Sequence, residues 1–232
     1  MQAEFPEFSL DLQPSERNRK KFKLEHLREA QEKSWAALRE IIPEIQVGMT
    51  GREAEKKADE ILKLLGSLKN WHRPIVRVGE NTLKKFSEAS NADIRLKPDD
   101  LYFIDLGPLW EIEGVMYEGD VGDTFVLGSN PAHVEIAEAA RKVFASVSEI
   151  WKQESLSGKA LYLRASAEAE KLGYVLNQDV DGHRVGDFPH QIFFKGGLNE
   201  LDFKPSAGIW ILEIQIRHPE LSYGAFIEDM LG

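Results

Sequence analysis

Apolar residues recur every three or four positions in the first part of the chain, which is the spacing of one helix face. This pattern predicts a helix over 15–42 and a second over 47–66. The second helix carries signals at both ends, because Thr50 and Glu53 fit the S/T-x-x-E capping box and Gly66 supplies a stop. The chain therefore begins its regular structure with two consecutive helices.

Short runs of β-branched and aromatic residues follow these helices and predict strands. In the first half they cover 73–79, 101–107 and 122–128. In the second half, helical patterns cover 131–153 and 158–174, and extended runs cover 182–194, 208–218 and 223–232. Because each half reads as helix, helix, strands, we expect one α+β domain with an antiparallel-rich sheet. The expected parts are an N-terminal arm of 1–15 and halves of about 16–130 and 131–232.

Composition narrows the class of protein. Hydrophobic residues make up 42% of the 232 residues, which is enough for a core, and the formal net charge of -10 disfavours nucleic acid and anionic membranes as partners. The chain has no cysteine, which excludes disulfides, thiolate metal sites and a cysteine nucleophile. It shows neither an apolar run of about 20 residues nor the apolar core of a signal peptide, so we expect a cytoplasmic protein.

Polar side chains interrupt the predicted extended segments where apolar residues are expected. They are Asp105, Asp120, His183, Glu213 and Glu228. Ionised carboxylates inside a sheet are costly unless they have partners. Carboxylates and an imidazole form an oxygen-rich set of hard ligands, which suits one or two divalent ions such as Mn, Co, Zn or Fe. The pattern therefore indicates a metal site.

Taken alone, each of these residues also has an ordinary structural explanation. Asp105 and Asp120 lie near glycines, as residues that start turns do. His183 fits a hydrogen-bonded histidine of the core, and Glu228 lies near the end of the chain, where acids are usually solvated. Glu213 is the hardest to explain in this way, because "GIWILEIQI" is otherwise almost continuously apolar.

Taken together, the residues resemble the metallopeptidase family with the pita-bread fold, which includes methionine aminopeptidase, the Xaa-Pro aminopeptidases, prolidase and creatinase. The segments that carry the resemblance are "FIDLG", "YEGDVGDTFVLG", "GHRVG", "ILEIQI" and "GAFIED", which hold the five residues in the family's ligand order. The form "GAFIED" is closer to the proline-specific branch than to methionine aminopeptidase. The resemblance covers roughly residues 20–232 and implies a pita-bread fold of two pseudo-symmetric halves.

The resemblance also implies a chemistry and an assembly. The five residues would hold two divalent ions, and a hydroxide bridging the ions would attack a peptide bond or another C–N amide bond. Glu213 would also take the proton and pass it to the leaving amine. His190, which corresponds to the second histidine of the family's motif, would donate to the developing oxyanion. The family resemblance further suggests a homodimer.

Two side chains near the predicted site depart from the proline-specific pattern. Phe86 stands where the family has a histidine that helps to bind substrate, and His72 is a candidate to replace that histidine in space. Arg184 replaces a glycine beside His183, where it would either clamp a substrate carboxylate or neutralise the acidic site. We therefore expect His72 and Arg184 to bind substrate.

The interval between the two aspartates is also longer than the family's usual one. The extra residues, "PLWEIEGVMY", predict an inserted hairpin over 108–117. Trp110 and Tyr117 on this hairpin either line the pocket or pack in the ordinary way.

The resulting expectation is a metal-dependent hydrolase of the Xaa-Pro aminopeptidase or dipeptidase type, which acts on a peptide or a small amide. Retention of all five ligand positions favours an enzyme, because non-catalytic relatives generally lose ligands. Three alternatives stay open because Phe86 replaces the expected histidine. They are a creatinase-like small-molecule hydrolase, a lyase that uses the same ions, and a non-catalytic binding module.

Overall fold

An eight-stranded sheet runs through the computed structural model, which describes residues 13–67 and 69–232. The strands follow one another as β1 (Lys69–Val78), β2 (Leu101–Ile112), β4 (Val121–Val126), β8 (Gly224–Met230), β7 (Trp210–Arg217) and β5 (Val175–Leu176). Two short strands lie off this path: β3 (Val115–Glu118) pairs with β2, and β6 (His183–Arg184) pairs with β7. The pairs are antiparallel, which confirms the expected α+β class and sheet type.

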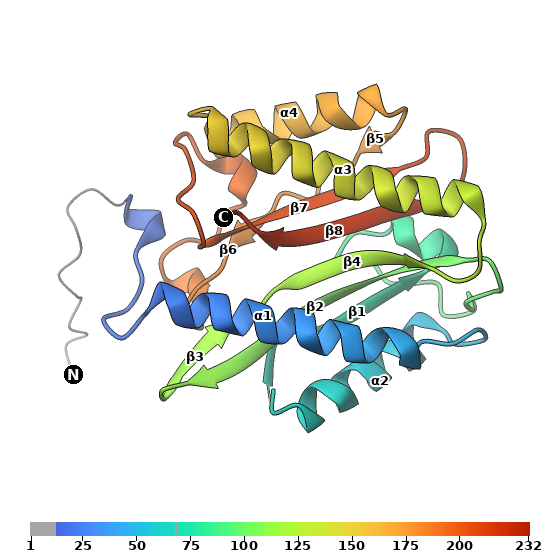
Figure 1. Ribbon diagram of the computed structural model, residues 1–232, viewed down its shortest axis with the longest axis horizontal. Coiled ribbons are helices and arrows are strands. Elements are labelled where there is room, and N and C mark those ends of the chain that lie inside the picture. The colour runs from blue at the N-terminus through green and yellow to red at the C-terminus, as the bar shows by residue number, and fades with distance from the viewer. Residues whose placement is uncertain (1–12, 68) are drawn as a thin grey trace.

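Helices cover the sheet in two pairs (Figure 1). The first pair, α1 (Leu24–Ile41) and α2 (Gly51–Leu64), lies along the strands of the first half. The second pair, α3 (Pro131–Gln153) and α4 (Gly158–Lys171), lies along β7 and β8. Short 3-10 turns complete the elements: Pro14–Glu16, Ile42–Glu44, Gly79–Leu83, His190–Ile192 and Leu198–Glu200. In the described part of the chain, no helix combines the length and apolarity that a membrane span requires.

The end signals predicted for the second helix are present in α2. The Thr50 side chain accepts from the Glu53 amide and the Glu53 side chain accepts from the Thr50 amide, so the capping box is complete. Gly66 follows the helix with a φ of 97°, a left-handed conformation that glycine adopts without strain.

The first helix begins later than the sequence predicts, at Leu24 instead of residue 15. The Glu16 carboxylate explains the difference, because it accepts from the Trp210 indole Nε1 at 2.8 Å and from the Ser206 amide at 2.8 Å. This buried anchor ties the preceding segment to β7 and keeps it out of the helix, and Lys23 is extended. Residues 1–12 of the predicted arm lie outside the described residues, and its boundary and those of the halves stay predictions.

Strand periodicity separates an apolar core from an open face. On β2, Ile104 and Leu106 pack into the main core with the helices, whereas Phe103 and Asp105 line a cavity on the other face. Strands β7 and β8 alternate in the same way. Because successive side chains of a strand point to opposite faces, an acid within an apolar strand still reaches the open face. The acids therefore lie outside the main apolar core, on the face that forms the cavity, although Asp120 and Glu228 are buried there.

The inserted hairpin is confirmed as the β2–β3 pair. Its turn residues Glu113 and Gly114 both have positive φ, 49° and 75°, as a two-residue type I′ hairpin requires. Trp110 and Tyr117 are buried, and the Trp110 indole donates to Ser34 Oγ at 2.9 Å. Of the two alternatives for these aromatic residues, ordinary packing is the one that the structure shows.

The extended run predicted over 182–194 is wrong beyond its first residues. Only His183–Arg184 forms a strand, and His190–Ile192 is a 3-10 turn. Two causes act together. Pro189 has no amide to donate to a ladder, and the Glu118 carboxylate takes the amides of Gly186 and His190, each at 3.0 Å.

Candidate metal centre

Acidic side chains form one row across four neighbouring strands. Asp105 on β2 is in register with Gly122 on β4, Gly122 with Glu228 on β8, and Glu228 with Glu213 on β7. Gly122 keeps the middle of the row open, because an added Cβ would lie 2.6 Å from Phe226 Cε1 and 3.0 Å from Glu228 Oε1. The sheet register therefore brings together three carboxylates that are far apart in the sequence.

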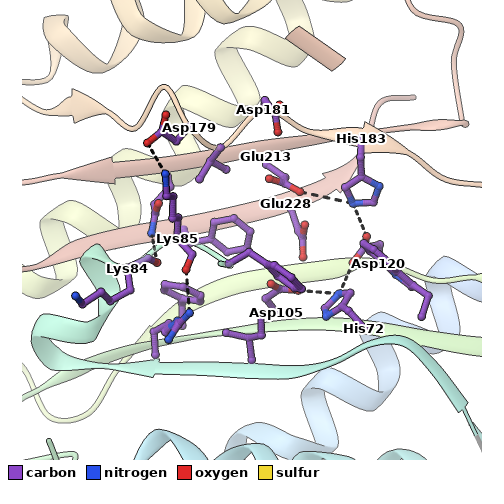
Figure 2. A pocket seen from close by; sticks show the side chains of 18 residues that line it. His72, Lys84, Lys85, Asp105, Asp120, Asp179, Asp181, His183, Glu213 and Glu228 are labelled. Atoms are coloured by element: carbon purple, nitrogen blue, oxygen red, sulfur yellow. Dashed lines mark hydrogen bonds and ion pairs between the residues drawn. The ribbon is translucent and has the colours of Figure 1, made fainter. Parts of the chain in front are cut away.

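Asp120 and His183 extend this row from the side (Figure 2). Asp120 lies two residues before Gly122 and so reaches the same face. The His183 Nε2 atom lies 2.6 Å from Asp120 Oδ2 and 3.6 Å from Glu213 Oε1. The other ring nitrogen, Nδ1, lies 2.8 Å from the Arg184 carbonyl, which can only accept a hydrogen bond. His183 therefore presents Nε2 to the acids.

The five predicted ligands line one cavity, together with a second histidine. His72 on β1 places its Nε2 atom 3.2 Å from Asp105 Oδ1 and 3.6 Å from Asp120 Oδ1. Its ring lies edge-on to Phe86, with centroids 5.7 Å apart, beside the position of the missing family histidine. A substrate contact for His72 stays a prediction.

Several carboxylate oxygens in this cluster are buried without a hydrogen-bond partner among the described residues. They are Asp105 Oδ1, both oxygens of Asp120 and Glu228 Oε1. The His72 and His183 rings offset part of this charge when they are protonated, but four carboxylates outnumber two histidines, and buried carboxylates that nothing neutralises are costly. Candidate ligand atoms of Asp120, His183 and Glu228 lie within 4.8 Å of one another, and those of His72, Asp105 and Asp120 do as well. Oxygen and imidazole donors at this spacing fit divalent cations.

The pKa values of three carboxylates in the cluster are raised, mainly by burial. Burial raises the pKa of Glu213 to about 7 and that of Glu228 well above its usual value. Burial also raises the pKa of Asp105, although the nearby His72 opposes it. Without a cation, protons must therefore reduce the repulsion.

The pKa values of His183 and Asp120 shift in the directions that favour their charged forms. Burial lowers the pKa of His183, but Asp120 and Glu213 outweigh burial and raise it to about 10. Burial would raise the pKa of Asp120, but the contacts with His183 and His72 lower it. Asp120 is thus the most strongly ionised acid of the cluster, with a histidine on each side.

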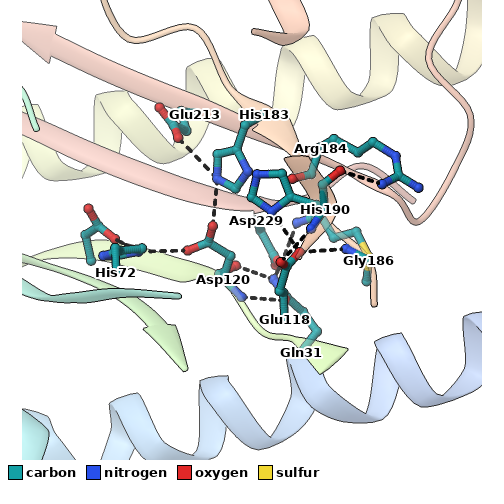
Figure 3. A network of polar contacts seen from close by, with 12 residues as sticks. Gln31, His72, Glu118, Asp120, His183, Arg184, Gly186, His190, Glu213 and Asp229 are labelled. Atoms are coloured by element: carbon teal, nitrogen blue, oxygen red, sulfur yellow. Dashed lines mark hydrogen bonds and ion pairs between the residues drawn. The ribbon is translucent and has the colours of Figure 1, made fainter. Parts of the chain in front are cut away.

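His190 lies behind His183 and does not line the cavity (Figure 3). The two rings stack with centroids 5.5 Å apart, and His190 Nδ1 donates to Glu118 Oε2 at 2.9 Å. Trp71, which does line the cavity, packs edge-on against His190. Donation from His190 to an oxyanion stays a prediction. Glu118 was not among the site residues predicted from the sequence, although its position two residues before Asp120 indicated a place near the site.

The prediction that Arg184 binds substrate or neutralises the site needs correction. The side chain is buried on the far side of β6 and is not among the cavity-lining residues. Its guanidinium donates to the Arg17 carbonyl and to Asn18 Oδ1, each at 2.5 Å. Since His183 and Arg184 are adjacent in a strand, they point to opposite faces. Arg184 therefore anchors the segment before α1.

The cavity has a volume of about 210 Å³ and two chemically different ends. The acids and histidines form one end, and Lys84 and Lys85 lie at the other (Figure 2). The Lys85 ammonium pairs with Asp179 at 2.9 Å. Between the ends, the wall is apolar and includes Ile75, Phe103, Val180 and Phe226. No feature of the sequence predicts this position for the lysines, because charged residues in a loop are usually solvated.

Comparisons with known proteins also indicate a metal-binding fold of the peptidase type. Residues 25–231 match the sequence profile of metallopeptidase family M24. No curated protein sequence gives a significant match. Prolidase from Pyrococcus furiosus is similar in structure, with 27% identity and a TM-score of 0.69 over 89% of this chain and 59% of that one. Prolidase from Pyrococcus horikoshii OT3 has 25% identity and a TM-score of 0.70 over 89% and 58%.

Methionine aminopeptidase from Thermotoga maritima shares the fold at lower identity. It is 18% identical, with a TM-score of 0.66 over 89% of this chain and 91% of that one. The chain thus spans about three fifths of the length of the two prolidases, and nearly the whole of the aminopeptidase.

Proposed function

The chain belongs to metallopeptidase family M24, and from this premise we propose that it is a metal-dependent hydrolase that cleaves Xaa-Pro dipeptides or a related small amide. The observation that carries the proposal is the cluster of acids and histidines that line one cavity, in which the buried carboxylates outnumber the imidazoles. Such a cluster is costly without further cations, and non-catalytic relatives generally lose these ligands.

The residues would divide the work by position. One divalent cation would be held by Asp105 and a second by His183 and Glu213. Asp120 and Glu228 would contribute to both. Cations held there would supply Lewis-acid activation of water and of the scissile carbonyl. Two ions per chain, with Mn among the candidates, and a cytoplasmic homodimer are part of the proposal on the family resemblance alone.

Glu213 is the residue that would move the proton. Its carboxylate lines the cavity, and the family resemblance gives it the role of general base. It would take a proton from water and deliver it to the leaving amine nitrogen.

The opposite end of the cavity would select the substrate. A volume of about 210 Å³ lies below the usual range for drug-sized ligands, which favours a substrate the size of a dipeptide. Phe103, Val180 and Phe226 would contact an apolar ring such as that of proline. The free carboxylate of a dipeptide would then face Lys84, whose side chain is 40% exposed at the mouth.

The proposal is tested by metal loading and by substrate choice together. Protein stripped with a chelator and reloaded with Mn, Co or Zn should hydrolyse Xaa-Pro dipeptides, and elemental analysis should give about two ions per chain. Glu213→Gln should abolish activity, whereas Asp202→Asn, an exposed acid remote from the cavity, should not change it. Dipeptides with an amidated C-terminus should be cleaved more slowly.

Two results would contradict the proposal in different ways. Absence of bound metal under all loading conditions would mean that the acids do not serve as ligands. Metal binding without hydrolysis of any dipeptide or small amide would favour the binding-module alternative, in which Phe86 in place of the family's histidine marks the loss of catalysis.

A further inference from the structure

We infer that His72 is a metal ligand in addition to the five residues predicted from the sequence. The centre would then contain two imidazoles, His72 from β1 and His183 from β6. The inference rests on the proposed function, since it assigns one more ligand to that centre. It differs from the expected role of His72, which was contact with substrate.

Distances between donor atoms carry the first step. Ligands bound at about 2.0–2.2 Å to one ion lie about 3.0–3.5 Å apart when they occupy neighbouring positions of a tetrahedron or octahedron. His72 Nε2 lies 3.2 Å from Asp105 Oδ1 and 3.6 Å from Asp120 Oδ1. Both distances from the His72 nitrogen are therefore near the spacing of ligands around a common cation, and the three residues offer ligand atoms within 4.8 Å of one another.

The other ring nitrogen of His72 fixes the direction of the free lone pair. Nδ1 lies 2.7 Å from the Arg73 carbonyl, and because a carbonyl only accepts, Nδ1 carries the hydrogen. Nε2 faces carboxylate oxygens, which also only accept, so either a second ring proton or a metal ion must lie between them. In the metal-free protein, burial lowers the pKa of His72, but Asp105 and Asp120 outweigh burial and raise it to about 9. A metal ion would take the place of that proton, and a backbone bond on the second nitrogen is the usual support of a histidine ligand.

His183 repeats the same local arrangement. Its Nδ1 lies 2.8 Å from the carbonyl of the following arginine, and its Nε2 lies 2.6 Å from Asp120 Oδ2. The two histidines therefore approach opposite oxygens of Asp120, each oriented by its own backbone. Since His183 is a predicted ligand, the matching orientation of His72 supports the same role.

The backbone around His72 is shaped to place the ring over the acids. The β1–β2 register shifts between Asn70 and His72 and again between His72 and Ile75. Such irregularities re-aim side chains and are frequent beside active sites. Here they bring both Trp71 and His72 to the cavity, although neighbours in a regular strand point to opposite faces.

Gly107 on β2 makes the space for this arrangement. An added Cβ would lie 2.3 Å from the His72 ring and 2.4 Å from the Trp71 indole nitrogen. His72 is also enclosed, with a side chain that is only 6% exposed and with Trp71 packed edge-on at 4.3 Å. An enclosed ring aimed at carboxylates suits a metal ligand better than a group that must meet an incoming substrate.

Proton NMR of the cobalt-loaded protein tests the inference independently of activity. Each histidine bound to cobalt through Nε2 gives one strongly shifted, exchangeable Nδ1–H signal. The wild type should give two such signals, and His72→Gln and His183→Gln should each remove a different one. His133→Gln, which changes a histidine bonded to the Asp99 carbonyl outside the cavity, should keep both. His72→Gln should also weaken cobalt binding by at least about 10-fold.

The outcomes separate this inference from the proposed function. A single imidazole signal in the wild type, lost in His183→Gln, would overturn the assignment of His72 while leaving a metal centre in place. Loss of every shifted signal because cobalt does not bind would overturn the proposed function as well. If His72→Gln does not fold, Gly107→Ala keeps the imidazole but displaces it, and should remove the same signal.

Discussion

Replacing Glu213 with glutamine should stabilise the metal-free protein at alkaline pH and lose that benefit at acid pH. Glu213 lies in the row of acids on the open face, in register with Glu228. Burial raises its pKa from 4.5 to about 7, so the folded state holds a proton more tightly than the unfolded chain does. Stability from this group is therefore greatest below about pH 4.5 and is lost as the pH rises through 7.

The size of the effect follows from the two pKa values. A rise from 4.5 to about 7 costs the folded state about 1 kcal/mol at pH 5 and about 3 kcal/mol at pH 8. The glutamine variant avoids this cost at both pH values, so its advantage over the wild type should grow by about 2.5 kcal/mol between them. For a domain of this size, that corresponds to roughly 5–10 °C in Tm. Any fixed cost of burying the amide cancels in this difference.

Thermal unfolding in the presence of a chelator, at pH 5 and pH 8, measures this quantity directly. Glu220→Gln is the matched control, because Glu220 is exposed and its variant should melt with the wild type at both pH values. If the Tm difference between Glu213→Gln and the wild type were the same at pH 5 and pH 8, Glu213 would not have the raised pKa that burial in the cavity gives it. The explanation of the site as a set of buried, neighbouring acids would then be wrong.

Three further predictions test separate parts of the site. Added Mn should raise Tm more at pH 8 than at pH 6. The reason is that the protons held by Glu213 (pKa about 7) and His183 (pKa about 10) must leave for the ion to bind. An equal rise in Tm at both pH values would contradict this. Glu118→Ala should lower the free energy of unfolding by about 3–5 kcal/mol, since it leaves buried donors of Gly186 and His190 unpaired; denaturant titration measures it, and a loss below 1 kcal/mol would refute it. Phe86→His should raise kcat/KM on Xaa-Pro dipeptides about 10-fold, the size of one hydrogen bond to a charged group; no change would shift the cause to the shape of the cavity.

The sequence was sufficient to predict the fold because its signals were local and consistent with one another. The capping box at Thr50 and the apolar strand around Glu213 each have a single reading, and the structure follows them. Its failures arose where tertiary bonds overrode the pattern. Glu16 holds the segment before α1 away from the helix, and Glu118 takes the amides that a strand over 182–194 would have used. Neither partner is close in sequence to the segment that it controls.

The positions of the acids and of His183 in the candidate site were predictable, but the directions of Arg184 and His72 were not. An acid in an apolar strand has few uses, whereas the direction of Arg184 depends on whether that residue or His183 takes the open face of β6. The sequence does not decide this, because either residue is polar. For His72, the deciding feature is the pair of register shifts along β1, which no spacing of residues reveals.

Two glycines in the strands mark where other residues of the centre approach the backbone closely. Gly122 stands in the middle of the acidic row and Gly107 faces His72, and a Cβ at either would collide with a residue of the centre. Glycine weakens a strand interior, so its presence there needs a compensating reason such as close approach of another group. Both glycines lie on β2 or β4, within the segment that also holds Asp105 and Asp120. An apolar strand that combines an acid with a nearby glycine therefore indicates that another group lies close against the same face. Here the groups that fill the space beside the glycines are other members of the centre.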